Sequence, residues 1–447
     1  MKIRCLFAAL GASCASLLLL APASAAAATL CVNPSGSAGC SKTINGAVSL
    51  AKPYDVIMVW PGTYKEDVVI GMPLSLIGAG AKKTIIDAMG LANGIFVDGY
   101  DNAGLAHVTV AGFTVEHAQW EGVLVVSAAD VTIRENAIAN NTKATAVFTG
   151  QPGGCSGQPA FELDETGDCG GGLHLIGVWN STVSDNTIMQ NDDGILVSDE
   201  TAASHDVLIS KNAVNDNPGE CGIVLASHPP VGAIGSAHYG VFHITVDGND
   251  LENNGVIVGG AGVGIFSDGI GQGRTSQNVI THNRLIGNGI GGVSLHTHVG
   301  PKFGLPADDM DGNQIIGNYI AKNLADSNDT ATPGRVGINI NSGGGGSPVR
   351  GTVIAGNTIT DEDVDIAVST PALVNVHGNN LLGNGTGVAN ICAFDHAACT
   401  GGSVATENYW GCASGPGAKH CTTASGPNVL WDPWLSTPET DSTPIHP

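Results

Sequence analysis

A short pattern of apolar and polar positions recurs along most of the chain. An asparagine is followed two positions later by an apolar residue, and most copies continue with a glycine–apolar pair that opens a short strand. The asparagines that begin the pattern are Asn136, Asn186, Asn212, Asn249, Asn283, Asn318, Asn357 and Asn379. The glycines that begin its second half are Gly194, Gly222, Gly264, Gly292 and Gly337. The closest copies are about one coil of a parallel β-helix apart, and repetition at such a period predicts a solenoid.

The repeat also predicts how the coils hold together. No copy can bury its apolar face alone, so each must stack on the next. Asparagines at one turn position of successive coils suit stacked amide ladders, which satisfy buried polar groups along the stack. We therefore predict an all-β chain folded as a right-handed parallel β-helix with three parallel sheets.

Different sequences mark the two ends of this stack. Ser41 can cap a short amphipathic helix that runs to Lys52 and covers the open first coil. The aromatic, cysteine-rich C-terminal segment is expected to form the second cap. The predicted divisions are a signal peptide at 1–28, an N-terminal cap and first coils at 29–90, the repeat body at 91–390, a C-terminal cap at 391–438 and a disordered tail at 439–447.

The N-terminus and the cysteines indicate a secreted or periplasmic protein. Lys2 and Arg4 precede an apolar stretch and small residues suited to cleavage, as in a secretory signal peptide. No other segment is long and apolar enough to cross a membrane. Eight cysteines form close pairs that fit disulfides better than the ligand spacing of zinc sites. The pairs are Cys31/Cys40, Cys155/Cys169, Cys392/Cys399 and Cys412/Cys421, with the connectivity between 392 and 421 left open and Cys221 expected to be a partly buried thiol.

Charge and composition limit the classes of molecule that the protein can bind. The 64 glycines suit a fold with many tight turns. A formal net charge of −23 argues against nucleic acid, because no basic stripe is present to neutralise phosphates. The same charge disfavours unaided binding of an acidic polysaccharide, which would need a bridging cation such as Ca²⁺ or a local basic patch. We expect a monomer that binds an extended polysaccharide.

The ends of the mature chain resemble a known family. The phrases that carry the resemblance are Trp60-Pro-Gly-Thr-Tyr-Lys-Glu, Leu76-Ile-Gly-Ala-Gly, Thr84-Ile-Ile-Asp, Asn408-Tyr-Trp-Gly and Pro433-Trp-Leu. They are similar to the first and last coils of secreted right-handed parallel β-helix proteins of the pectin-lyase-like superfamily. The resemblance implies the fold, whereas the superfamily includes lyases, glycoside hydrolases, epimerases, esterases and non-enzymatic members. The chain lacks the Gln-Asp and Asp-Phe-Ile-Phe-Gly motifs of pectin methylesterases and the Asp-Pro-His motif of alginate epimerases.

Insertions between coils locate the candidate site. They fall at 199–206, 226–243, 267–277, 296–312 and 341–351, each after the glycine–apolar strand and before the next asparagine. Insertions at one corner of successive coils would stack into a wall beside one sheet and leave a long cleft for a polymer. The alternative is that they are surface excursions without a function.

The outward positions of the neighbouring strands supply candidate residues. Aligning the coils on Ile195, Ile223, Ile265, Val293 and Ile338 places Asp268, His296 and Asn341 in one lateral row. An Asp–His row could orient an imidazole as a general base, and a nearby cation could neutralise a substrate carboxylate. The predicted catalytic residues are Asp268, His296, His298, Arg274 and Lys302, and the predicted substrate-binding residues are Phe266, Asn339, Asn341 and His228. The alternative is an ordinary solvated sheet face.

Two acidic motifs compete with this row. Asp192-Asp193-Gly resembles the paired aspartates with which polygalacturonases act on a water and a glycosidic oxygen, although the same position is a plain turn in other coils. Asp308, Asp309 and Asp311 offer oxygen ligands at the spacing of calcium loops, but no closing glutamate is present. The sequence thus favours a glycan-cleaving lyase or glycoside hydrolase. The alternative is a non-catalytic β-helix that binds glycan or acts as a scaffold.

Overall fold

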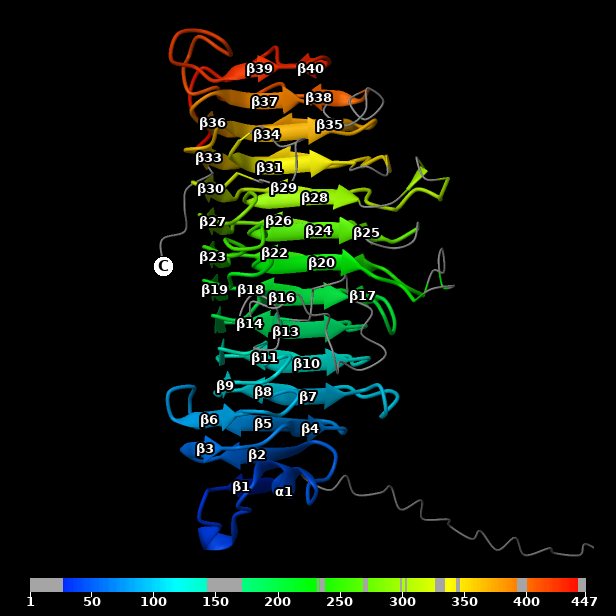
Figure 1. The fold of residues 1–447 in the computed structure, drawn as a ribbon, viewed down its shortest axis with the longest axis vertical. Helices are drawn as coiled ribbons and strands as arrows, with labels where there is room; N and C mark the ends of the chain where they lie inside the picture. Colours follow the sequence, from blue (N-terminus) through cyan, green and yellow to red (C-terminus); the bar gives the residue numbers. More distant parts are fainter. Residues whose placement is uncertain are drawn as a thin grey trace, which may run out of the picture.

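The computed structural model describes residues 27–142, 171–230, 233, 238–267, 272–297, 300–301, 304–325, 334–342, 346–391 and 400–440. Predicted features on other residues, including the signal peptide and four cysteines (Cys155, Cys169, Cys392 and Cys399), lie outside this part of the chain. The described coils stack along one axis into three long sheets and one small sheet, as Figure 1 shows. All pairings between the strands are parallel, which confirms the predicted parallel β-helix.

Each coil of the repeat body contributes one short strand to each long sheet, and the end coils contribute fewer. Sheet A contains β1 (Thr29–Val32), β2 (Asp55–Val59), β5 (Leu74–Gly78), β8 (Thr109–Ala111), β11 (Thr132–Arg134), β14 (Thr182–Ser184), β18 (Leu208–Ser210), β22 (Thr245–Asp247), β26 (Val279–Thr281), β29 (Gln314–Ile316), β32 (Val353–Ala355), β35 (Leu373–His377), β38 (Gly402–Val404) and β40 (Val429–Leu430). Sheet B contains β3 (Gly62–Tyr64), β6 (Thr84–Asp87), β9 (Thr114–Glu116), β12 (Ala137–Ala139), β15 (Thr187–Met189), β19 (Ala213–Asn215), β23 (Asp250–Glu252), β27 (Arg284–Ile286), β30 (Tyr319–Ala321), β33 (Thr358–Thr360) and β36 (Asn380–Leu382).

Sheet C carries the candidate site. It contains β4 (Val68–Ile70), β7 (Ile95–Asp98), β10 (Val123–Val126), β13 (Gly171–Ile176), β16 (Asp193–Ser198), β20 (Ile223–Ser227), β24 (Val263–Ser267), β28 (Val293–Thr297), β31 (Val336–Asn341), β34 (Val364–Ser369), β37 (Thr386–Asn390) and β39 (Thr423–Ser425). Sheet D, the small sheet, contains β17 (Ser204–His205), β21 (Val241–Phe242) and β25 (Thr275–Ser276).

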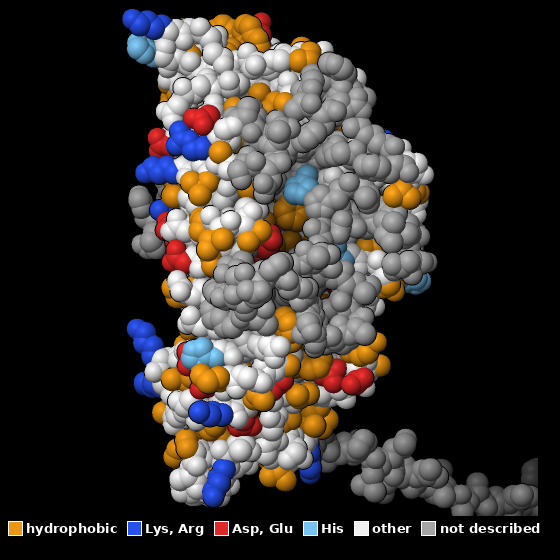
Figure 2. Space-filling view, viewed as in Figure 1, with side chains coloured by type: hydrophobic (Ala, Val, Ile, Leu, Met, Phe, Trp, Pro, Cys, Tyr) orange, Lys and Arg blue, Asp and Glu red, His pale blue; other side chains and the backbone are white. Residues whose placement is uncertain are grey.

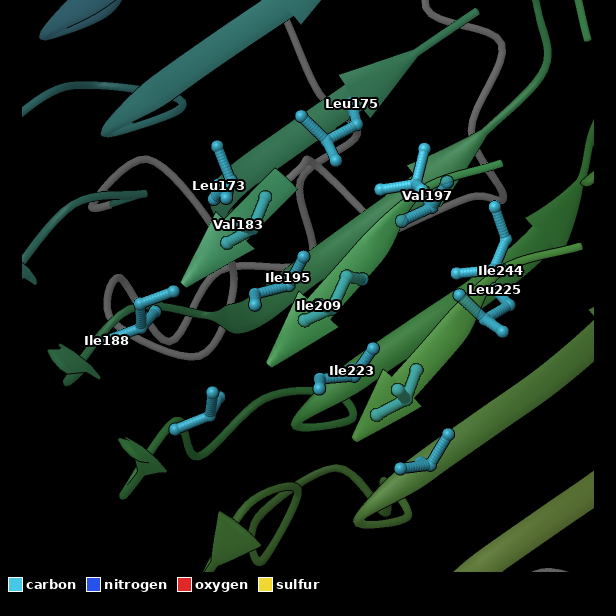
Figure 3. Close-up of a cluster of buried hydrophobic side chains, with 14 of the residues drawn as sticks. Leu173, Leu175, Val183, Ile188, Ile195, Val197, Ile209, Ile223, Leu225 and Ile244 are labelled. Carbon is cyan, nitrogen blue, oxygen red and sulfur yellow. The ribbon is translucent and has the colours of Figure 1, made fainter. Parts of the chain in front are cut away.

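The core is a stack of aliphatic side chains that point inward from the three sheets. In one coil, Val183 of sheet A, Ile188 of sheet B and Ile195 of sheet C are each buried. Figure 3 shows these side chains repeating from coil to coil, with Ile209 and Ile223 in the next turn of the stack. Because side chains alternate along a strand, one inward apolar residue between two outward ones is enough to build each three-residue strand.

Two ladders of buried asparagines run along the corners on either side of sheet B. In the predicted ladder, each Oδ1 accepts bonds from the backbone N–H and side-chain amide of the preceding rung, as Asn212 does from Asn186 at 3.0 Å for both bonds. The rungs are Asn136, Asn186, Asn212, Asn249, Asn283, Asn318, Asn357, Asn379 and Asn408. The second ladder was not predicted, and its rungs are Asn141, Asn191, Asn217, Asn254, Asn288, Asn323 and Glu362.

The N-terminal cap matches the prediction in kind but not in its boundaries. Helix α1 (Ile44–Val48) packs at the end of the stack, and Thr43, not Ser41, is its N-cap residue. The extended backbone of Thr43 lets its side chain accept a bond from the N–H of Gly46, whereas Ser41 pairs with Val32 as an isolated β-bridge. The helix ends at Val48, with Ser49 as its C-cap residue, and so stops short of the predicted end at Lys52.

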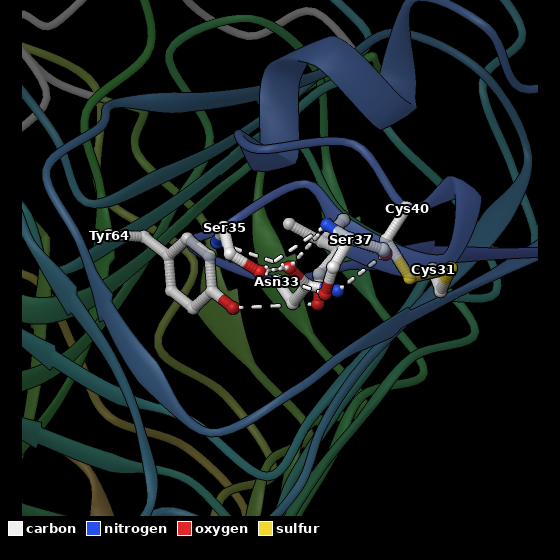
Figure 4. Close-up of a disulfide and its surroundings, with 7 residues drawn as sticks. Cys31, Asn33, Ser35, Ser37, Cys40 and Tyr64 are labelled. Atoms are coloured by element: carbon white, nitrogen blue, oxygen red, sulfur yellow. Dashed lines mark hydrogen bonds between the residues drawn. A yellow bond between two sulfur atoms is a disulfide. The ribbon is translucent and has the colours of Figure 1, made fainter.

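Two predicted disulfides are confirmed, and both lie near the ends of the stack. Cys31–Cys40 closes a loop in the N-terminal cap, where the side chain of Asn33 bonds to Ser35 and Ser37, as Figure 4 shows. Cys412–Cys421 lies in the C-terminal cap. Cys221 forms no disulfide and is buried, and its sulfur accepts a bond from the N–H of Ala261 at 3.1 Å.

The insertions flank sheet C on both of its edges. After β16, β20 and β24 the chain continues into sheet D, which Figure 1 shows at the end of the sheet C strands, so these insertions lie at the predicted corner. The chain is also lengthened at the opposite edge, between β12 and β13, β23 and β24, and β30 and β31. The five predicted insertions thus all follow strands of sheet C at one corner, whereas the lengthened connections at the opposite edge were not predicted. Among the described residues, no helix has the length and apolar character needed to cross a membrane.

Candidate functional site

The outer face of sheet C carries the predicted substrate-binding row, but in a different register from the predicted one. Val263, not Ile265, lies opposite Ile223 on one side and Val293 on the other. Two glycine–apolar pairs stand next to each other here, Gly262-Val263 and Gly264-Ile265, and the structure uses the first to open the strand. The shift of two residues places Phe266 in the row where Asp268 was predicted. Asp268 lies outside the described residues.

The corrected row has a partly exposed aromatic floor. Phe266 lies opposite His296, which in turn lies opposite Asn341. The rings of Phe266 and His296 are 4.2 Å apart between centroids and tilted by 42°. Both rings are half-buried, whereas Asn339 and Asn341 are buried beside them. Figure 2 shows a hollow with histidine and hydrophobic side chains on the face that sheet C occupies. This row therefore combines a stacking surface with polar amides, a combination that suits a sugar ring.

A second group of polar side chains lies where β16 and β20 end, and we call it the acid–histidine cluster. Its members are Glu121, His174, Ser198, Asp199, Glu200, Ser227 and His228, all of them buried. Glu200 is at its centre: its Oε2 accepts a bond from Ser198 Oγ at 2.5 Å, and its Oε1 is 3.5 Å from Nδ1 of His228. At 6% exposure, His228 is the most exposed member.

Asp199 holds the other side of this cluster. Its Oδ1 accepts a bond from the backbone N–H of His228 at 2.6 Å, and its Oδ2 accepts one from Ser227 Oγ at 2.8 Å. Its neighbour Glu200 is tied to β13 through Ser198, because Nε2 of His174 lies 2.9 Å from Ser198 Oγ. The cluster therefore links three successive coils through contacts of its side chains.

The pKa values of the adjacent carboxyl groups of Asp199 and Glu200 are shifted in opposite directions. Burial, reinforced by the charge of Glu200, raises the pKa of Asp199 to about 7. Burial also acts to raise the pKa of Glu200, but the hydrogen bond and charge of His228, together with the charge of His174, outweigh it and leave the pKa lowered. Near neutral pH the pair can thus hold one protonated and one ionised carboxyl group. Such opposed shifts in neighbouring groups are typical of acid–base catalysis.

Arg274 and the paired aspartates lie outside this cluster. Arg274 lies beside sheet D. Its Nε is 3.5 Å from Asp309 Oδ2, and its guanidinium is 3.7 Å above the ring of Phe242. His298 and Lys302 lie outside the described residues. Asp192 and Asp193 are buried at the start of β16, at the opposite end of that strand from Asp199. Arg274 is therefore already paired with a carboxylate.

The three aspartates predicted to bind calcium have separate partners. Asp308 accepts a bond from the N–H of Gly273, and its Oδ2 is 3.3 Å from Ser347 Oγ, while burial raises its pKa to about 6. Asp309 faces Arg274, and Asp311 accepts a bond from the N–H of Arg350. Among the residues that the structure describes, no three acidic, histidine or cysteine side chains are placed to hold a metal ion. Calcium binding by this segment gains no support from these contacts.

The sequence contained a signal for the cluster that the prediction did not use. Ser198 lies three positions after the aligned residue Ile195, as His296 does after Val293, and Asp199 and Glu200 begin the first insertion after it. His228 was predicted as a substrate-binding residue, and it lies in the cluster. His174 and Glu121 were missed because they lie on coils whose outward positions had not been aligned.

Comparison with known proteins agrees with this architecture. The family described as "Right handed beta helix region" matches residues 93–304. The catalytic domain of a GH87 alpha-1,3-glucanase, solved as its D1069A variant in complex with tetrasaccharides, superposes with a TM-score of 0.53 at 12% identity, covering 87% of this chain and 66% of that chain. The A-module of the Azotobacter vinelandii mannuronan C-5 epimerase AlgE6 superposes with a TM-score of 0.51 at 16% identity, covering 89% and 94%. No curated protein sequence gives a match.

These similarities define the class of protein. The chain is a right-handed parallel β-helix protein. The two solved structures share this fold, which the resemblance of the first and last coils implied.

Proposed function

We propose that this protein cleaves a polysaccharide, with the glycan lying along the Phe266–His296 row and the acid–histidine cluster supplying proton transfer. The observation that carries the proposal is the pair of adjacent carboxyl groups, Asp199 and Glu200, whose pKa values are shifted in opposite directions beside His228. Hydrolysis of a glycosidic bond needs one group that donates a proton to the leaving oxygen and one that activates water. Asp199 suits the first role and the Glu200–His228 pair suits the second.

Hydrolysis is favoured over elimination by the charge around the site. A lyase acting on uronic acids needs a cation or metal to neutralise the substrate carboxylate. Arg274 is already engaged by Asp309, and the formal net charge of the chain is −23. We therefore expect a neutral glycan to be the better substrate. Activity on an acidic glycan would require added Ca²⁺ and would disappear with a chelator.

The names of the compared structures support a carbohydrate substrate. One is an α-1,3-glucanase and the other a mannuronan epimerase, both with this fold. At their low identity they support the class of ligand and not the reaction.

One observation favours a second function, a non-catalytic glycan-binding protein. The side chain of Glu200 is fully buried and that of His228 is only 6% exposed, so the substrate would meet the cluster only at its histidine edge. In that case the polar contacts of the cluster would hold the coils together, and the Phe266–His296 row alone would bind sugar.

Product analysis decides between these functions. The purified protein is incubated with neutral plant glycans, α-glucans, pectin and alginate, with and without Ca²⁺, and reducing ends and ultraviolet absorbance are measured over time. A hydrolase releases reducing ends without absorbance, whereas a lyase produces unsaturated ends that absorb. Measurable binding without either product across the whole panel would refute catalysis and support the binding protein.

Variants then assign the roles. Glu200→Gln and His228→Ala should each lower kcat about 100-fold or more, the usual range for loss of an acid–base group. His296→Ala should mainly raise KM, because it removes part of the floor. Asp185→Asn, an exposed residue on the same turn of the stack, removes one negative charge away from the site and should leave activity unchanged. Wild-type turnover by folded Glu200→Gln would refute the assignment.

A further inference from the structure

A continuous chain of polar contacts reaches Glu200 from the side away from His228. His174 occupies an outward position of β13, opposite Leu196 of β16. Its Nε2 is 2.9 Å from Ser198 Oγ, and Ser198 Oγ is 2.5 Å from Glu200 Oε2. On the far side of the ring, Nδ1 of His174 is 3.9 Å from Glu121 Oε1. That distance is beyond hydrogen-bond reach, so the chain of hydrogen bonds ends at His174.

The direction of each hydrogen bond is set by the ionisation of Glu200. An ionised carboxylate can only accept, so the Ser198 hydroxyl donates its one proton to Oε2. Ser198 Oγ must then accept from His174, which fixes a proton on Nε2 of that ring. On the other oxygen, Nδ1 of His228 lies 3.5 Å from Oε1, and the charge of the carboxylate favours a proton on that nitrogen. A neutral His228 is thereby held with Nε2 unprotonated, which is the form needed in a general base.

We propose that His174 and Ser198 are positioning residues, which hold Glu200 ionised and thereby set both the tautomer of His228 and the pH range in which it accepts a proton. The proposal deepens the proposed function, since it rests on His228 and Glu200 being the groups that transfer protons. It differs from a packing role because it links an imidazole on β13 to the titration of another imidazole two strands away.

The groups that face Glu200 determine whether the pH at which His228 titrates rises or falls when Ser198 is replaced. They are Asp199 in its own segment, His228 after β20 and His174 on β13, with Glu121 behind His174. Removing the Ser198 hydroxyl takes a charge-assisted bond from the carboxylate. The carboxylate, with its charge less compensated, then stabilises protonated His228 more strongly. We expect Ser198→Ala to move the titration of His228 upward by about one pH unit, the usual effect of one hydrogen bond to a charged group.

Nuclear magnetic resonance of histidine-labelled protein tests this without relying on activity. The His228 signal is identified by its loss in His228→Gln, and its titration is compared in wild type, Ser198→Ala, Ser198→Thr and His174→Gln. Ser198→Thr keeps the hydroxyl and should restore the wild-type value, whereas His174→Gln should shift it in the same direction as Ser198→Ala. Ser181→Ala removes a buried hydroxyl from another corner of the stack and is the matched control.

The outcomes separate the two proposals. An unchanged His228 titration in both Ser198→Ala and His174→Gln, each folded by circular dichroism, would overturn the positioning role even if the protein cleaves glycans. A shift of the expected sign would support it even if no glycan is cleaved, in which case only the proposed function fails. If the protein is active, the acidic limb of its pH–rate profile should move upward by the same amount in Ser198→Ala.

Discussion

Glu362 ends the second ladder with a carboxyl group where every other rung has an amide. Its Oε1 accepts bonds from the backbone N–H and the side-chain amide of Asn323, both at 2.9 Å, so it copies the contacts of an asparagine rung. Burial raises its pKa from 4.5 to about 7. Burial likewise raises the pKa of Asp365, and the charge of Glu362 adds to that shift.

The raised pKa makes Glu362 a pH-dependent weakness of the fold. The folded state binds this proton more tightly than the unfolded state, so its contribution is most favourable below pH 4.5 and is lost as pH rises through 7. A difference of about 2.5 pH units corresponds to about 3 kcal/mol of unfolding free energy. Glu362→Gln removes the ionisation while keeping an oxygen acceptor for Asn323.

Between pH 4.5 and pH 8 we therefore expect the unfolding free energy of Glu362→Gln to fall by about 3 kcal/mol less than that of the wild type. The assay is equilibrium unfolding in guanidinium chloride at several pH values, with the difference between variant and wild type plotted against pH. This difference largely cancels the titration of Asp199, which both proteins share, and it includes the change that loss of the Glu362 charge makes to the titration of Asp365. Glu407→Gln, an exposed residue, is the matched control and should leave the pH dependence unchanged. If the Glu362→Gln and wild-type curves run parallel from pH 4.5 to 8, Glu362 does not ionise as argued.

Three further predictions test the elements that hold the stack together. In a denaturation assay, Asn217→Ala should cost about 2–5 kcal/mol of unfolding free energy, because it leaves the N–H groups of Asn191 and the carbonyl of Ile188 without their side-chain partner. Replacement of the exposed Asn253 by alanine is the control and should cost far less. Ile209→Ala should cost about 2–5 kcal/mol, because the side chain is fully buried between coils and its removal leaves a cavity, and a loss below about 1 kcal/mol would contradict tight packing there. The double variant Cys31→Ser, Cys40→Ser should lower the unfolding free energy by about 2–3 kcal/mol, because the disulfide closes only a short loop. An unchanged denaturation midpoint would show that the N-terminal cap unfolds independently of the stack.

The repeat made the fold predictable because each coil obeys the same local constraint. An asparagine at one corner, an inward aliphatic residue and a glycine before the sheet C strand recur with little change, so one correct coil predicts the others. The second ladder had an equally regular signal that the prediction did not use. Its rungs come five residues after those of the first ladder, as Asn141 does after Asn136 and Asn191 after Asn186. Glu362 stands five residues after Asn357, so the same spacing identifies the carboxyl group that replaces an amide.

The site was less predictable because it depends on register and on the residues just beyond the end of each strand. A shift of two residues at Val263 leaves the inward pattern intact, since positions two apart point the same way, but it exchanges Phe266 for Asp268 in the row that faces outward. The repeat does not specify the direction of the side chains after Ser198 and Ser227, where the strands end and the insertions begin. Asp199 and His228 meet there only because adjacent coils bring the ends of β16 and β20 together. A contact that joins residues 29 positions apart through a backbone N–H and a carboxylate has no periodic signature, so only the stacked structure reveals it.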